Sequence, residues 1–110
     1  MSIQKEERVS ERVEQIMDGF TALDDASKMM LDSMVKTFAW YEVSCDDLME
    51  RIDREGLLVG DGEMRKENPA LAVLHKTAAR KQEYFGKIMT VARRAQSDES
   101  SEMMDFIADA

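Results

Sequence analysis

The sequence has little of what usually stabilises a fold covalently or interrupts helices: one cysteine, one proline and five glycines in 110 residues. A single thiol, Cys45, cannot form a disulfide within the chain. No apolar run has the length of a membrane span, and no segment resembles a secretory signal. So few prolines and glycines leave little material for loops, which favours long helices. We therefore expect a helical, cytosolic protein with no membrane contact.

The usual features of an enzyme are also absent. No glycine-rich phosphate loop followed by Lys and Ser or Thr is present, so nucleotide hydrolysis has no visible apparatus. His75, the only histidine, and Cys45 both fall within predicted helices, without neighbours that would activate them. Asp46, Glu50 and Asp53 share one helical face, but a solvated or ion-paired face is the simpler interpretation than a cation site. We expect no enzyme activity, no cofactor and no metal.

Charge, in contrast, is plentiful and unevenly distributed. The net charge is −8, and 35% of the residues are charged. Residues 1–64 hold 7 basic and 16 acidic side chains, a net of −9, whereas residues 65–96 hold 8 basic and 2 acidic, a net of +6. Residues 97–110 hold five acidic side chains and no basic one, a net of −5. The acidic total therefore hides a basic block that can contact phosphates.

The segment between Leu23 and Gly56 contains no glycine or proline. It predicts a helix of about 33 residues, roughly 50 Å long. Thr21 or Asp24 can cap its start, and Gly56 ends it. Its apolar residues recur in alternating steps of three and four, the period of a coiled-coil seam. The seam consists of Leu31, Met34, Phe38, Tyr41, Cys45, Leu48 and Ile52.

A second apolar line runs along the same predicted helix. It widens the apolar surface beyond one seam, which indicates that the helix contacts two neighbours. A charge substitution such as Val35→Glu should therefore dissociate a ring and leave a seam-built dimer largely intact. The line consists of Val35, Ala39 and Val43, with Met30 and Met49 beside it.

The second long helix is predicted to begin at Pro69, with Asn68 as its N-cap, and to run to about Gln96, roughly 40 Å. Two helices of similar length joined by a short segment predict an antiparallel hairpin, in which acidic residues of the first helix, such as Asp47, can lie near basic residues of the second. The second seam consists of Leu71, Leu74, Ala78, Lys81, Phe85, Ile88, Ala92 and Ala95.

The segment between the two helices, residues 56–68, is here called the joint. Gly60-Asp61-Gly62 permit positive φ, so Leu57–Val59 and Glu63–Arg65 can flank a tight turn in a small β-hairpin; a mobile loop is the alternative. A two-stranded ribbon is marginal alone, so it would need a partner, such as a neighbour's helix end.

Three regions follow from these patterns. Residues 1–20 predict a short amphipathic helix, from about Lys5 to Met17. Residues 21–96 form the helical-hairpin oligomerisation domain, and residues 97–110 an acidic flexible tail suited to docking onto a partner. The fold class is all-α: a long antiparallel helical hairpin with a short β-hairpin-like joint, a short N-terminal helix and an acidic C-terminal tail.

A long helix with an aromatic middle (KTFAWYEVSCDDLMERIDREG), a glycine-containing ribbon (LLVGDGEMRK) and a helix opening with ENPALAVLHK follow one another. This order resembles the small subunit of tailed-phage terminases, in which a "G…K-N-P" joint precedes the second long helix. The resemblance covers about Leu23 to Ile88, some 60% of the chain, and its most specific piece is Asn68-Pro69-Ala70. The family's usual Gly-Leu-Thr-Pro-like turn after the second helix is missing.

The resemblance implies a non-catalytic protein of the bacterial host cytoplasm. Similar subunits form homo-oligomeric rings through their hairpins, bind double-stranded viral DNA and pass it to a large subunit that carries the ATPase and nuclease. The expected interface residues are Met34, Val35, Phe38, Tyr41, Leu48, Ile52, Leu74, Phe85 and Ile88. The candidate DNA-binding residues are Arg65, Lys66, Lys76, Arg80, Lys81, Lys87, Arg93 and Arg94. The candidate docking residues for the large subunit are Met103, Met104, Phe106 and Ile107.

Any DNA binding should be to phosphates and non-specific, because the N-terminal region lacks the extra helices of a recognition domain. The basic residues can instead neutralise the acidic first helix, within one chain or between neighbours. A competing hypothesis is a dimeric adaptor or regulatory protein that forms a four-helix bundle without nucleic acid. The second apolar line favours the ring.

Overall fold

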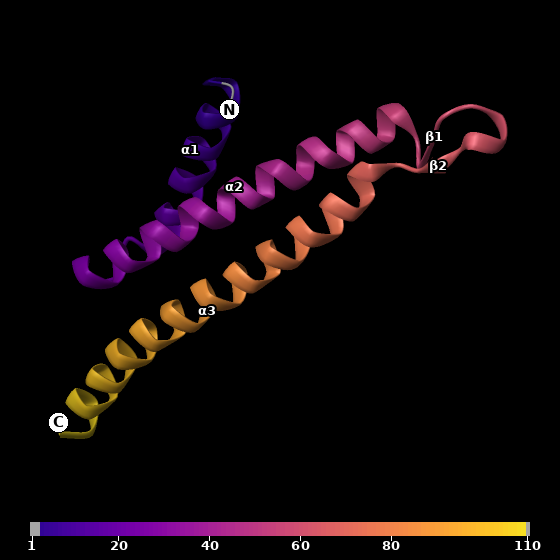
Figure 1. Cartoon of the computed structure of the whole chain (residues 1–110). Coiled ribbons are helices and arrows are strands. Elements are labelled where there is room, and N and C mark those ends of the chain that lie inside the picture. Colours follow the sequence, from indigo (N-terminus) through magenta and orange to yellow (C-terminus); the bar gives the residue numbers. More distant parts are fainter. Residues whose placement is uncertain (1–2, 110) are drawn as a thin grey trace.

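The computed structural model describes residues 3–109, without the side chains of Ile3 and of residues 96–109 (Figure 1). The predicted fold class is confirmed: two long helices form a hairpin, preceded by a short helix and connected by a two-stranded joint. The elements are α1 (Ile3–Met17), the 3-10 turn η1 (Asp18–Phe20), α2 (Asp25–Glu55), β1 (Leu58–Val59), the 3-10 turn η2 (Gly62–Met64), β2 (Lys66–Glu67) and α3 (Pro69–Asp109).

The helix ends follow the capping chemistry of the sequence. Asp24 is the N-cap of α2, since its carboxylate accepts a hydrogen bond from the backbone N–H of Ser27. Gly56 ends α2 with a φ of 93°, a conformation that glycine adopts without strain. At the other end of the chain, α3 continues beyond its predicted end near Gln96 to Asp109. The serine- and acid-rich run after Gln96 contains neither glycine nor proline to stop a helix.

The three helices form a single layer in which α1 and α3 lie on opposite sides of α2 (Figure 1). The backbone measures 76 × 27 × 16 Å, and its radius of gyration is 19.8 Å, against about 13 Å for a compact chain of this length. The accessible surface is 8192 Å², against roughly 6,200 Å² for a compact monomer of 12.6 kDa. One chain therefore leaves about 2,000 Å² more surface in water than a globular protein of its mass.

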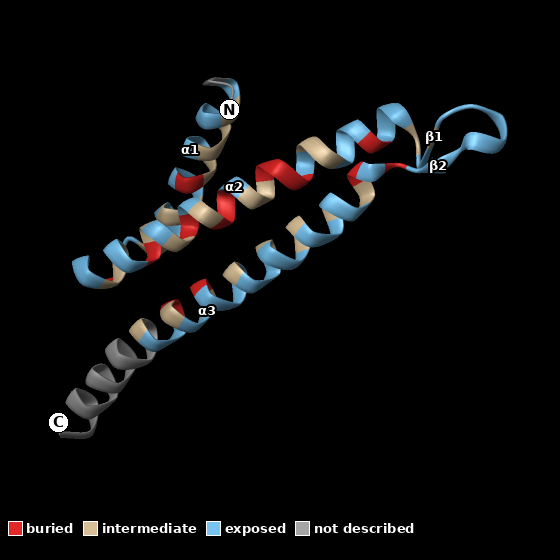
Figure 2. Cartoon of the chain, viewed as in Figure 1, coloured by how far each residue is buried: buried red, intermediate tan, exposed pale blue. Residues whose placement is uncertain are grey.

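The core lies along α2, where the seam is buried or half-buried and Val35, Ala39 and Val43 of the second line are buried (Figure 2). Leu31 and Val35 have no exposed surface and share one buried cluster with Val13 of α1 and Ile88 of α3. The second line therefore does have its own neighbour, but that neighbour is α1 of the same chain. This corrects the ring argument from Val35, because its side chain is already covered before any assembly.

The joint is a small β-hairpin, with Leu58 opposite Glu67 and Val59 opposite Lys66. The second strand lies later than predicted, because Gly62–Met64 form the turn η2, in which Met64 N–H donates to the Asp61 carbonyl at 3.0 Å. Among the described helices, none combines the length and the apolar character that crossing a bilayer requires.

Candidate assembly and nucleic-acid interfaces

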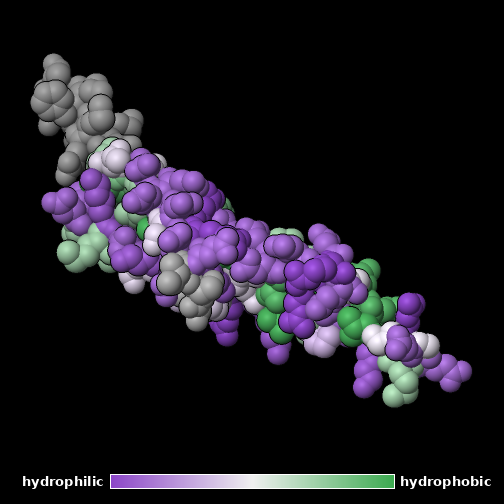
Figure 3. Space-filling model, turned by 90° about the horizontal axis from the view of Figure 1, so that it is seen from above, coloured by the Kyte–Doolittle hydropathy of each residue, from purple (hydrophilic) through white to green (hydrophobic). Residues whose placement is uncertain are grey.

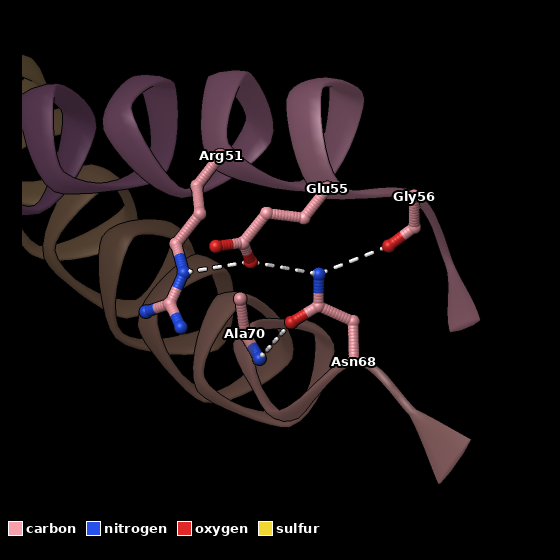
Figure 4. Close-up of polar contacts among 5 residues, drawn as sticks. All are labelled: Arg51, Glu55, Gly56, Asn68 and Ala70. Atoms are coloured by element: carbon pink, nitrogen blue, oxygen red, sulfur yellow. Dashed lines mark hydrogen bonds and ion pairs between the residues drawn. The ribbon is translucent and has the colours of Figure 1, made fainter. Parts of the chain in front are cut away.

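A polar cluster around Asn68 fixes the geometry of the joint (Figure 4). The Asn68 side-chain amide donates to the Gly56 carbonyl at 2.9 Å and to the Glu55 carboxylate at 3.2 Å. Its carbonyl oxygen accepts from the backbone N–H of Ala70 at 3.0 Å, which caps α3. Asn68 is only 1% exposed, so this one side chain connects the end of α2 to the start of α3.

Arg51 completes this cluster. Its guanidinium donates to Glu55 at 3.0 Å. Hydrogen bonds from Arg51 and then from Asn68 hold the pKa of Glu55 below its ordinary value, because both favour the ionised carboxylate. The sequence predicted Asn68 only as a helix cap, and the link back to α2 became visible only in three dimensions.

The acidic residues of α2 find their partners on α1 and within α2. Arg8 pairs with Asp47 at 2.7 Å, and Arg12 pairs with Glu42. Lys5 of the same helix donates to the Ser44 hydroxyl at 2.8 Å. Among the described residues no ion pair joins α2 to α3. The expectation that basic residues of α3 neutralise α2 within the chain is therefore not met, because Asp47 and Glu42 of α2 pair with arginines of α1 instead.

The predicted DNA-binding cations consequently face water along α3. Four exposed cations lie on one face of the helix. Lys76, Arg80 and Lys87 follow one another at spacings of four and seven residues, and Arg94 follows seven residues after Lys87. Glu83 lies between them and pairs with Arg80 at 3.1 Å and more distantly with Lys87 at 3.9 Å. Such exposed pairs within one helix contribute little stability, so these cations remain available to a partner.

The remaining cations of the predicted set are placed differently. Arg65 and Lys66 are exposed in the joint, and Arg93 is exposed on another side of α3. Lys81 is half-buried and lies near Cys45, where its charge partly offsets the burial that raises the pKa of that thiol. The structure thus separates the eight predicted DNA-binding residues into a line on α3, a pair at the joint and isolated positions.

The predicted interface residues divide by burial. Phe85 is 48% exposed, and its ring centre lies 6.2 Å from that of buried Phe38. Half-buried positions are Met34, Tyr41, Leu48 and Leu74, while Val35, Phe38, Ile52 and Ile88 are buried within one chain. The buried side chains stabilise the fold of a single chain, which leaves Phe85 as the most accessible of the predicted set.

Aromatic rings and lysines connect the three helices on one side. The Lys5 ammonium lies 4.3 Å from the centre of the Trp40 ring, and the Lys87 ammonium 4.8 Å from that of Tyr84. Tyr41 lies between the two rings, 5.6 Å from Trp40 and 5.8 Å from Tyr84. Beside Trp40 a shallow groove of about 580 Å³ is lined by Glu6, Val9, Ser10, Val13, Glu14 and Lys36.

Several apolar side chains are exposed at positions that the sequence did not predict to be interfaces. Leu57, Leu58 and Met64 of the joint are 64%, 54% and 73% exposed, and Met29 at the start of α2 is 77% exposed. From the side of α1 the surface is mostly hydrophilic, with hydrophobic residues gathered toward the joint (Figure 3). Isolated positions that break the helical period carry no signal in a periodicity analysis, so only the structure reveals them.

A metal-binding arrangement is absent from the described residues. In that part of the chain no three His, Cys, Asp or Glu side chains are placed to hold a metal ion. His75 is exposed on α3, and Cys45 is buried. The candidate docking residues Met103, Met104, Phe106 and Ile107 lie outside the residues whose side chains the structure describes.

No protein-family model matches this chain, and neither a curated protein nor a solved structure matches it. The resemblance to small terminase subunits therefore depends on the order of the elements and on the sequence of the joint.

Proposed function

We propose that this chain is the small, non-catalytic subunit of a tailed-phage terminase. In this proposal it assembles into a homo-oligomeric ring in the cytoplasm of the bacterial host, binds viral DNA, and recruits or regulates the large subunit. The ATP-driven and nucleolytic steps of genome packaging then belong to that large subunit.

The observation that carries the proposal is the single-layer shape. A layer of three helices has two uncovered faces, and domains normally bury apolar surface between two or more layers. The excess of about 2,000 Å² over a compact monomer is more than twice the roughly 800 Å² that one partner contributes to a standard protein–protein interface, so it is enough for contacts with two neighbours. Half-exposed Phe85 and the apolar residues of the joint are the contacts that neighbouring copies would cover.

The DNA role is supported by the exposed cations of α3, which form no ion pair with α2 among the described residues. Ionic contacts with phosphates release condensed counterions, so the affinity should fall steeply with salt. No recognition domain is present in the described region, and α1 packs on α2 rather than standing free. Binding is therefore proposed to be independent of sequence.

Fluorescence anisotropy with double-stranded DNA tests this role. For unrelated duplexes of equal length at 50 mM salt, we expect similar affinities that fall by about 10³-fold or more at 200 mM, if six or more phosphates are contacted. Absence of binding at low salt, or tight binding to one sequence that survives 200 mM salt, would contradict it.

A dimeric adaptor without nucleic acid is the second candidate. It is favoured by the finding that α1 covers the second apolar line, which leaves the strip of α3 around Phe85, 48% exposed, for a second copy. Two copies joined along that strip would form a four-helix bundle from their α2 and α3 helices. A discrete dimer mass without DNA binding would support this candidate.

A further inference from the structure

The outer side of α1 carries a row of acidic residues without partners. Glu7, Glu11 and Glu14 follow one another in steps of four and three, which places them on one face of the helix. All three are exposed, and within the described chain none takes part in an ion pair. The cations Arg8 and Arg12 lie on the side of α1 that faces α2, where they are paired. We call Glu7, Glu11 and Glu14 the acidic row.

The outer helix on the other side of α2, α3, carries the complementary charge. Lys76, Arg80 and Lys87 lie on one face of α3, all exposed, and are here called the basic row. Because α1 and α3 lie on opposite sides of α2 (Figure 1), the two rows of one chain cannot meet each other. The acidic row therefore lies on α1 and the basic row on α3, the two outer helices of the layer.

We propose, on the basis of the proposed assembly, that α1 of one copy lies along α3 of the next, with the acidic row against the basic row. The partner is a second copy of this chain. Contacts between unlike rows leave each copy with one row free for a further neighbour, and such head-to-tail contacts form a ring where the rotation between copies closes.

Lengths limit how much of α3 this contact covers. The 15 residues of α1 extend about 22 Å and the acidic row itself about 10 Å, while Lys76 and Lys87 are about 17 Å apart and Lys76 and Arg94 about 27 Å apart along the helix axis. One α1 therefore spans the basic row but not Arg94 as well. The proposal assigns the basic row to assembly and leaves Arg93, Arg94 and the joint cations Arg65 and Lys66 to DNA.

The charge of α1 favours a second copy over DNA as the partner of the basic row. The chain itself supplies an exposed acidic face on α1, and within the described chain this face has no ion-pair partner. Duplex DNA would repel such a face, whereas the basic row of a second copy would attract it. Glu83 lies within the basic row and pairs with two of its cations. The carboxylate of Glu83 opposes a phosphate and a partner glutamate alike, so the choice between the two partners depends on the exposed acidic face of α1.

Charge reversal with complementation tests the contact. One variant carries Glu7→Lys, Glu11→Lys and Glu14→Lys, and the other carries Lys76→Glu, Arg80→Glu and Lys87→Glu. All six side chains are exposed, so both variants should fold, as circular dichroism will check. Each alone places like charges in contact, which should raise the apparent dissociation constant of assembly about 100-fold or more. An equimolar mixture restores opposite charges at every contact and should assemble again.

The matched control is Arg93→Glu with Arg94→Glu, which changes two exposed cations on the same helix outside the basic row. It should leave the assembly mass unchanged and weaken binding to duplex DNA. Sedimentation velocity measures the first result and fluorescence anisotropy the second.

Two results would overturn the inference. If the reversed basic row leaves assembly intact but abolishes DNA binding, the basic row is the DNA surface, and the proposed function survives without this contact. If both variants fail to assemble and the mixture does too, the two rows do not meet. A wild-type chain that neither assembles nor binds DNA would instead contradict the proposed function itself.

Discussion

Asn68 and Gly56 are 12 residues apart in sequence, yet the Asn68 side-chain amide donates to the Gly56 carbonyl at 2.9 Å (Figure 4). The same side chain caps α3 and contacts Glu55 of α2. A polar side chain that is buried and fully hydrogen-bonded specifies one geometry, because every alternative leaves some of its groups unpaired. This relationship explains how a ribbon with strands of only two residues remains attached in a defined direction.

Replacing Asn68 with alanine should therefore destabilise the chain by roughly 2–4 kcal/mol, since the substitution removes an N-cap and leaves the Gly56 carbonyl and the Ala70 N–H without this partner. Urea unfolding followed by circular dichroism measures the change. Asn68→Asp is the matched control: it keeps the acceptor for Ala70 but places a carboxylate beside Glu55. It should be destabilised at pH 7 and recover partly in acid. Equal stability of the wild type and both variants at pH 7 would show that the hydrogen bonds of Asn68 do not stabilise the fold.

The stability of the chain should fall as the pH is lowered below about 4.5, the ordinary pKa of Glu55. The pKa of folded Glu55 is lowered, first by its hydrogen bond from Arg51, so its contribution is fully present above the unfolded value and is lost as the pH falls through the folded value. The pKa of Asp24 is lowered too, by its hydrogen bond with Ser27, and acts in the same direction.

Glu55→Gln should make thermal stability less dependent on pH in this window. Glu63→Gln, at an exposed position of the joint, serves as the control and should behave like the wild type. An unchanged pH profile for Glu55→Gln would contradict a role for the ionised carboxylate.

A charge at Val35 should unfold the chain rather than separate its copies. Val35 has no exposed surface, and an unpaired carboxylate at a buried position costs roughly 4 kcal/mol or more, a large part of the stability of a small domain. Met30→Glu, at a position on α2 that is 55% exposed, should change stability by less than about 0.5 kcal/mol. Far-UV circular dichroism distinguishes the two. A folded Val35→Glu protein of reduced assembly mass would restore Val35 as an interface residue.

Gly60 should tolerate no side chain. Its φ is +99°, and a Cβ atom there would lie 2.9 Å from the backbone oxygen of Met64. We expect Gly60→Ala to cost about 1–3 kcal/mol of local stability and to lower the amide protection of the hairpin. Gly62→Ala is the comparison: its φ of +58° also strains an alanine, but its Cβ would meet no atom within 4 Å, so it should cost less than Gly60→Ala. Hydrogen exchange at Val59 and Lys66 reports on both, and equal protection in the two variants would refute the steric argument.

The sequence was sufficient to predict the helices but not which helix packs against which. Periodicity, Gly56 and the Asn68-Pro69 pair predicted both long helices, because capping and amphipathicity are local properties. The covering of Val35 by α1 could not be predicted, since periodicity identifies an apolar face but not the element that covers it. The pairing of Arg8 and Arg12 with α2 depends in the same way on tertiary placement. The second strand was misplaced because Gly62–Met64 turn once more before the chain returns.

The most direct test of the central claim, that this chain is a ring-forming subunit, is its assembly mass by native mass spectrometry at moderate salt. The account predicts a closed assembly of roughly eight or more copies of the 12.6 kDa chain, with a mass that decreases as salt screens the contacts between copies. A monomer, or a discrete dimer whose mass is unaffected by salt, would contradict it.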